Sequence, residues 1–167
     1  MIDLENGKIT MEYGAGGRAM EELISLIFKP AFASDFLDEG NDQAILPFPD
    51  KKGKIAFTTD SYVVTPLFFA GGNIGDLAIN GTVNDLAVGG AEPLYISAGF
   101  IIEEGFPISE MIKIAKTMGA AAKKAGVKVV TGDTKVVEKG AASGLFINTA
   151  GVGFVPEGVE LSGNKAT

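Results

Sequence analysis

The chain has 167 residues, 46% of them hydrophobic and 21% charged, which is the composition of one globular domain that buries roughly 70% of its unfolded surface. Its net charge of −7 gives no general basis for binding nucleic acid or anionic lipid. With no Cys and no His, disulfides, thiol nucleophiles, imidazole bases and thiolate or imidazole zinc sites are excluded. No apolar run reaches the roughly 20 residues of a membrane span, and the N-terminus is acidic, so we expect a cytoplasmic protein.

Hydrophobic spacing in the first half of the chain predicts one helix among extended segments. The elements expected there are a strand over residues 9–13, a glycine-rich loop over 14–17, a helix ending at Pro30, a loop over 31–40, and extended segments over 43–48 and 54–64. Met20, Leu23 and Ile27 recur at helical spacing, and the helix dipole favours Glu21 and Glu22 in the first turn.

The second half of the chain predicts two helices between strands. The expected elements are a helix over 73–88, a strand over 94–102, a helix from Pro107 to Gly126, and strands over 128–137 and 145–155. Asn73 is suited to cap the first of these helices, and Gly89 and Gly126 are suited to end the two helices. This order predicts an α/β (α+β) fold, in which a mixed sheet carries helices on one face.

The end of the chain differs in pattern from the rest. Residues 156–167 lose hydrophobic periodicity and contain no further closing element. We therefore expect one domain over residues 1–155 and, over 156–167, the start of a linker to a second domain.

Four aspartates lie within or next to apolar segments, where a carboxylate is unusual. Asp42 comes just before an extended segment, Asp60 and Asp133 interrupt apolar strands, and Asp85 follows Asn84 in an apolar helix. A buried carboxylate is costly unless it is paired, hydrogen-bonded or bound to a cation. Acids without His or Cys nearby form an oxygen donor set suited to Mg²⁺ and, through it, to nucleotide phosphates. The alternative for any one of them is a turn or capping role, which suits Asp60 and Asp85 least.

Two further features are suited to an anion. Gly14, Gly16 and Gly17 let backbone N–H groups approach a phosphate between a strand and a helix, although these glycines also suit a sharp turn. Lys135, two residues after Asp133, could meet a phosphate or form an ordinary surface ion pair. The spacing of the glycines in the glycine-rich segment matches neither the dinucleotide-binding fingerprint nor the P-loop.

Taken in order, these motifs resemble the aminoimidazole-ribonucleotide-synthetase-like (PurM-like) ATP-binding superfamily, over nearly the whole chain. The segments that carry this resemblance are the glycine-rich loop, Asn-Asp-Gln-Ala over 41–44, Thr-Thr-Asp-Ser over 58–61, Asn-Asp-Leu-Ala-Val-Gly-Gly over 84–90 and Gly-Asp-Thr-Lys over 132–135. The amino-acid sequence around Asp60 and Asp133 is most similar to that of the HypE family of [NiFe]-hydrogenase maturation proteins.

The resemblance implies a site for ATP and Mg²⁺. Asp42, Asp60 and Asp85 would hold Mg²⁺ against the phosphates, and Gly14, Gly16 and Gly17 would fold over the nucleotide. Asn84, Asp133, Thr134 and Lys135 would line the same cleft, with Lys135 as the candidate catalytic residue. The strands of two copies would pair into a dimeric, barrel-like core with ATP near the interface.

The reaction implied is the ATP-dependent dehydration of a carbamoyl group on the sulfur of a C-terminal cysteine, giving a thiocyanate. The implied partners are a second copy, the carbamoyltransferase HypF and the HypC–HypD scaffold. This chain departs from the family in having no Cys, and Tyr13 stands where we expect a His before the glycines. The alternatives are another PurM-like enzyme, of the selenophosphate synthetase or thiamine-monophosphate kinase type, and a catalytically silent dimerisation module.

Overall fold

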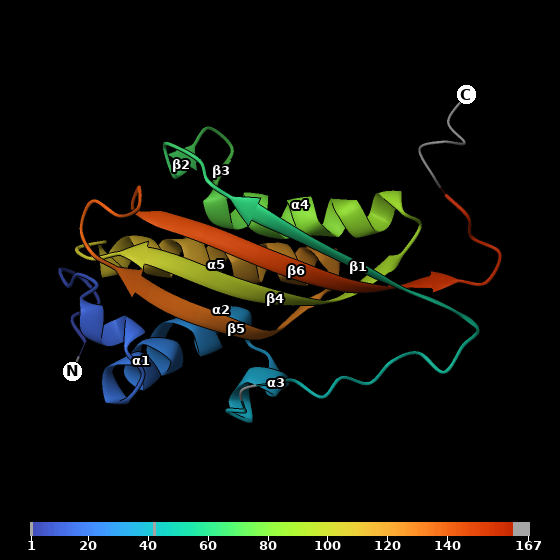
Figure 1. The fold of residues 1–167 in the computed structure, drawn as a ribbon, viewed down its shortest axis with the longest axis horizontal. Helices are drawn as coiled ribbons and strands as arrows, with labels where there is room; N and C mark the ends of the chain where they lie inside the picture. Colours follow the sequence, from blue (N-terminus) through green and yellow to red (C-terminus); the bar gives the residue numbers. More distant parts are fainter. Residues whose placement is uncertain (1, 42, 162–167) are drawn as a thin grey trace.

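A four-stranded mixed sheet forms the centre of the computed structural model, which describes residues 2–41 and 43–161 (Figure 1). Its strands are β1 (Gly53–Tyr62), β4 (Glu92–Glu103), β5 (Lys128–Val137) and β6 (Leu145–Pro156), in the spatial order β1-β6-β4-β5. β6 is antiparallel to both of its neighbours, whereas β4 and β5 are parallel. β2 (Phe68–Phe69) and β3 (Gly72–Asn73) form a small separate hairpin. The predicted mixed sheet is therefore confirmed.

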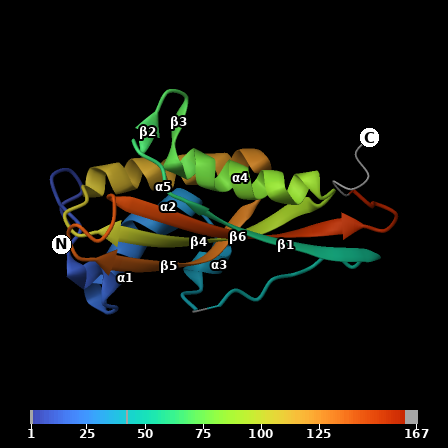
Figure 2. The same cartoon turned by 45° about the horizontal axis from the view of Figure 1, so that its top comes forward.

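Two long helices, α4 (Ile74–Val88) and α5 (Ile108–Ala125), lie behind the sheet in Figure 1 and above it in Figure 2. Asn73 caps α4: its Oδ1 accepts from Gly75 N at 2.8 Å, and its own N–H donates to Asp76 at 3.0 Å. Gly126 ends α5 at φ 73°, a conformation that glycine adopts without strain. The helices lie on one face of the sheet, as the sequence predicts.

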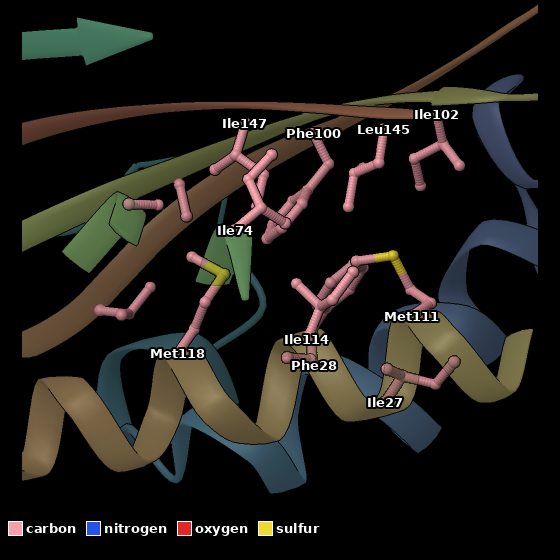
Figure 3. Packing of buried hydrophobic residues seen from close by; sticks show 14 of the residues in the cluster. Ile27, Phe28, Ile74, Phe100, Ile102, Met111, Ile114, Met118, Leu145 and Ile147 are labelled. Carbon is pink, nitrogen blue, oxygen red and sulfur yellow. The ribbon is translucent and has the colours of Figure 1, made fainter. Parts of the chain in front are cut away.

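The core fills the space between these helices and the sheet (Figure 3). Met111, Ile114 and Met118 of α5 are completely buried and point toward the strands. From the N-terminal region, Phe28 stacks on Phe100 of β4 with ring centroids 4.7 Å apart. This contact fixes the N-terminal helices beside α5 on the same face of the sheet.

The N-terminal region is helical over most of its length. Its elements are η1 (Met11–Gly14), α1 (Arg18–Leu23), the π-helical turn η2 (Ile24–Phe28), α2 (Lys29–Phe32) and α3 (Asp35–Asp38). The predicted strand over 9–13 is wrong: Ile9 exchanges backbone hydrogen bonds with Gly105 and Phe106, and a tight turn follows at once. The helix also continues past Pro30, because Pro30 lies in the first turn of α2, where its missing N–H is not needed.

The predicted extended segment over 43–48 does not form a strand. It runs without a strand partner past one end of the sheet, where the Tyr95 hydroxyl donates to the Pro47 carbonyl at 2.6 Å and Phe48 packs edge-on against Phe154. A strand requires a neighbouring ladder, and among the described residues none lies beside this segment. Side-chain contacts hold the segment in place of backbone pairing.

Candidate functional site

The two motifs that contain Asp60 and Asp85 meet where β1 faces α4. The Thr58 hydroxyl donates to the Asp85 carboxylate at 3.0 Å, which connects the strand to the helix. Asp60 lies two residues further along β1 and therefore on the same face of the sheet. Its Oδ1 accepts from the Ser61 N–H at 2.8 Å. Asn84, the neighbour of Asp85 on α4, is exposed beside them.

Beneath these acids lies a chain of buried hydroxyl groups that sequence reasoning missed. The Tyr62 and Thr82 hydroxyls are 3.2 Å apart, Thr82 is hydrogen-bonded to Thr149, and Thr149 also donates to the Ala78 carbonyl at 3.3 Å. Burial raises the pKa of the Tyr62 hydroxyl, and the nearby Asp60 carboxylate acts in the same direction. The position of Tyr62 beside the acids is predictable from the sequence. Side chains two residues apart on a strand lie on the same face, so Thr58, Asp60 and Tyr62 share one face of β1.

The other half of the predicted residues lies at the opposite edge of the sheet, on β5. A Cβ on Gly14 would lie 2.4 Å from the backbone nitrogen of Val136, so only glycine lets the N-terminal segment approach β5 this closely. Gly16 and Gly17 have φ values of 78° and 87°, which glycine favours, and both face open space. The glycine-rich loop therefore lies beside the strand that carries Asp133, Thr134 and Lys135.

The three predicted residues of β5 divide between its two sides. Lys135 Nζ and Asp133 Oδ1 are 3.7 Å apart on the exposed side, where more than half of each side chain is accessible. An ion pair this exposed contributes little to stability, which leaves both groups free to meet a ligand. Thr134 points the other way and is buried.

A cavity of about 290 Å³ lies between β5 and the N-terminal helices. Its lining combines residues of α1, η2 and α2 with Ala98 and Phe100 of β4 and residues 131–134 of β5. Residue spacing alone does not reveal this cavity, because its walls come from segments more than 50 residues apart in the sequence. Their meeting depends on the order of the strands.

The predicted acids do not form one cluster within this chain. Asp60 and Asp85 lie at the β1 edge and Asp133 at the β5 edge, with β6 and β4 between them, a separation of about 14 Å at the usual strand spacing. Asp42 lies outside the described residues. Within residues 2–41 and 43–161, no group of three or more acidic side chains is placed to hold a metal ion. Mg²⁺, however, is commonly held by one or two carboxylates together with substrate phosphates, and Asp60 and Asp85 fit that donor set.

The face of the sheet that is turned away from α4 and α5 carries apolar side chains in contact with water. Ile55 is 67% exposed and Phe57 is 69% exposed, although both belong to a regular strand. Next to them the face becomes polar: the Asn148 amide donates to the Asp60 carbonyl at 2.9 Å and to the Ser61 hydroxyl at 3.0 Å. Large apolar side chains exposed side by side are typical of an interface.

Of the described helices, none is both long and apolar enough to cross a membrane.

Comparison with known proteins identifies the fold and its relatives. Residues 40–155 match the family model of the AIR synthase related protein, N-terminal domain. Carbamoyl dehydratase HypE of Bradyrhizobium diazoefficiens is 57% identical over 165 residues, which cover 99% of this chain and 47% of that protein. The crystal structure of hydrogenase maturation protein HypE in complex with ATP is similar with a TM-score of 0.88 and 47% identity, over 94% of this chain and 46% of that one.

A structure of the HypE–HypF complex is also similar. Its TM-score is 0.67 at 50% identity, and the match covers 90% of this chain and 47% of the other. The chain thus spans about half the length of the relatives it matches.

Proposed function

Because the chain belongs to the family of AIR synthase related protein N-terminal domains, we propose that it is the ATP-binding and dimerisation domain of a HypE-type carbamoyl dehydratase. Residues 1–155 form this domain in the proposal, and 156–167 begin a linker to a second domain. Support comes from the high identity to HypE proteins and from the likeness to a HypE structure with ATP. The chain holds no Cys, so the sulfur that carries the carbamoyl group is not among its residues.

The observation that carries the proposal is the 3.0 Å hydrogen bond from Thr58 to Asp85. It joins two motifs that lie 27 residues apart and brings the carboxylate of Asp85 to the strand that carries Asp60. In the proposal these carboxylates hold Mg²⁺, which neutralises charge on the ATP phosphates when it is bound. Lys135 and the glycine-rich loop meet the phosphates from the other edge of the sheet.

Calorimetric titration with Mg-ATP tests this assignment. We expect Asp60→Asn and Asp85→Asn each to weaken binding tenfold or more, about 1.4 kcal/mol for each factor of ten. Asp50→Asn, which changes an exposed acid in the loop before β1, is the matched control and should bind as the original chain does. Equal affinity in all four chains would remove Asp60 and Asp85 from the site.

The proposal includes a homodimer formed through the open face of the sheet. A second copy that covers Ile55 and Phe57 would remove their exposed surface from water. In a dimer whose two-fold axis runs along the strands, the β1 edge of one copy faces the β5 edge of the other. The carboxylates of one copy would then complete the site with Lys135 and the glycine-rich loop of its partner, near a barrel-like core.

Sedimentation velocity separates this interface from a general effect of surface charge. Phe57→Asp places a charge in the open face and should convert dimers to monomers. Val88→Asp, at a side chain that is 75% exposed on α4, should leave the dimer intact. A catalytically silent dimerisation module would give the same sedimentation result, but Mg-ATP would then leave its melting temperature unchanged.

The proposed partners are the carbamoyltransferase HypF, supported by the similar HypE–HypF complex, and the HypC–HypD scaffold, which follows from the sequence resemblance alone. A cytoplasmic location is part of the same proposal. Pull-down of purified HypF by the chain, with Val88→Asp and Phe57→Asp variants for comparison, measures the first partnership directly.

A further inference from the structure

Three buried side chains, Tyr62, Thr82 and Thr149, form a hydroxyl network that connects β1, α4 and β6 beneath the acids of the β1 edge. Tyr62 is 6% exposed, and the two threonines are completely buried. The Tyr62 and Thr82 hydroxyls are 3.2 Å apart, and the Thr82 and Thr149 hydroxyls are hydrogen-bonded to each other. Thr149 also reaches the Ala78 carbonyl at 3.3 Å. The network therefore runs from β1 to α4, across to β6 and back to α4.

The last acceptor of the hydroxyl network fixes the direction of each hydrogen bond in it. The Ala78 carbonyl can only accept, so it receives the single hydroxyl hydrogen of Thr149. Thr149 must then accept from Thr82, and Thr82 must accept from Tyr62. Each hydroxyl thus donates within the network, and no hydrogen of the network is left over for the carboxylate of Asp60.

Two glycines allow α4 to approach the sheet closely at this point. A Cβ on Gly151 of β6 would lie 2.7 Å from Thr82 Cγ2. A Cβ on Gly81 of α4 would collide with the Tyr62 hydroxyl. Because neither glycine carries a side chain, the helix and the strands come near enough for the three hydroxyls to meet. The hydroxyl network and these glycines together determine how α4 lies on β1 and β6.

The carboxylate of Asp85 depends on that position of α4. Asp85 follows Thr82 by three residues, so both side chains leave the same side of the helix. Thr58 ties Asp85 to β1 at 3.0 Å, and Tyr62 ties Thr82 to the same strand four residues further along. Asp60 lies between these two ties on the same face of β1. The tie through Thr82 is buried and is therefore the firmer one, because water does not compete for it.

We infer that Tyr62, Thr82 and Thr149 are positioning residues for the acidic half of the site. They hold α4 on the sheet so that the carboxylates of Asp85 and Asp60 stay close enough to share one cation. The three hydroxyls touch neither the cation nor the nucleotide. The inference rests on the proposed function and adds to it the groups that set the geometry of the two carboxylates. Groups that orient the ligands of a metal typically change its affinity.

An engineered disulfide measures this positioning without any ligand. Because the chain has no Cys, Thr58→Cys together with Asp85→Cys gives a single thiol pair and removes the exposed tie between β1 and α4. The effective concentration of this pair, measured against glutathione, should fall about fivefold when Tyr62→Phe or Thr82→Val is added. Ile114→Val, at a completely buried residue of α5, is the matched control and should leave the effective concentration unchanged.

Calorimetry with ATP in Mg²⁺ and in EDTA measures the consequence for the cation. The ratio of the two affinities should fall about fivefold in Tyr62→Phe and in Thr82→Val. The ATP affinity in EDTA should stay the same, because the network does not touch the nucleotide. Thr82→Ser keeps the hydroxyl and should retain the full ratio, as should Ile114→Val. A general loss of stability would act on both affinities alike and would leave their ratio unchanged.

The outcomes separate this inference from the proposed function. An unchanged effective concentration in Tyr62→Phe and Thr82→Val overturns the inference, whatever their affinity for Mg-ATP. A lower effective concentration with an unchanged ratio of affinities also overturns it, because the network would then position α4 without consequence for the cation. If Mg²⁺ does not raise the ATP affinity of the original chain, the carboxylate site of the proposed function fails. The cross-linking result alone then decides whether the network positions Asp85.

Discussion

The two edges of the sheet carry complementary chemistry. At the β1 edge, Asp60 and Asp85 are held by hydrogen bonds from Ser61 and Thr58. At the β5 edge, the Asp133–Lys135 pair is exposed, the glycine-rich loop faces open space and a cavity lies behind the strand. One edge offers negative charge suited to a cation, and the other offers backbone N–H groups of the glycine-rich loop and the ammonium group of Lys135, which are suited to an anion.

Motifs that suggest one site along the sequence therefore need not form one site within one chain. β6 and β4 separate the two edges. In the proposed dimer, a second copy that covers the exposed apolar face would bring opposite edges into contact. Each edge can therefore be perturbed separately.

The largest expected effect concerns the contact between the glycine-rich loop and β5. Gly14→Ala should lower the free energy of unfolding by about 2–3 kcal/mol, because the new methyl group forces the loop and the strand apart. Gly16→Ala meets no neighbour and should cost only about 1 kcal/mol, from its left-handed φ. Urea unfolding followed by circular dichroism measures both. Equal losses would contradict the close approach at Gly14.

A smaller effect sharpens the description of the β1 edge. Burial and Asp60 raise the pKa of Tyr62 in the folded chain, so the unfolded chain ionises first as the pH rises. The ionisation of Tyr62 should therefore leave the free energy of unfolding unchanged below about pH 10 and lower it above that pH. Tyr62→Phe should be less stable near neutral pH by about 1 kcal/mol, from the lost Thr82 hydrogen bond.

The pH dependence of unfolding distinguishes the two contributions. The stability difference between the original chain and Tyr62→Phe should shrink above pH 10, because only the original chain can ionise at this position. If the stability difference stays constant up to about pH 11, which is roughly one unit above the usual tyrosine pKa, the pKa of Tyr62 is not raised in the folded chain.

The smallest expected effect concerns the loop that leaves the β5 edge. Glu103 accepts backbone hydrogen bonds from Gly140 and Gly144, and these bonds lower its pKa. The stabilisation is therefore present above the usual glutamate pKa of about 4.3 and is lost as the pH falls through the lower folded value. Glu103→Gln should be slightly less stable than the original chain at pH 7 and equally stable in strong acid. Thermal unfolding across this pH range checks both limits.

Local signals predict α4 and α5 well, because Asn73, Gly89 and Gly126 mark their ends within a few residues of the helices themselves. The strand expected over 9–13 and the extended segment expected over 43–48 fail for a common reason. Residues of the right composition form a strand only when another strand lies beside them, and that depends on distant parts of the chain.

The candidate site shows the same limit. The alternation of Thr58, Asp60 and Tyr62 along β1 follows from sequence, since side chains of a strand alternate between faces. The distance between Asp60 and Lys135 does not, because it depends on β6 and β4 lying between their strands. The buried partners of Tyr62 come from α4 and β6, so residue spacing alone could not identify them.

The most direct test of a site shared between two copies is complementation. Asp85→Asn disables the β1 edge and Lys135→Glu disables the β5 edge, so each chain alone should bind Mg-ATP weakly. When equal amounts of the two are unfolded together and refolded, half of the dimers are mixed, and each mixed dimer contains one site with both edges intact. We predict that about a quarter of the original number of binding sites returns. A mixture that binds no better than either variant alone would contradict the shared site.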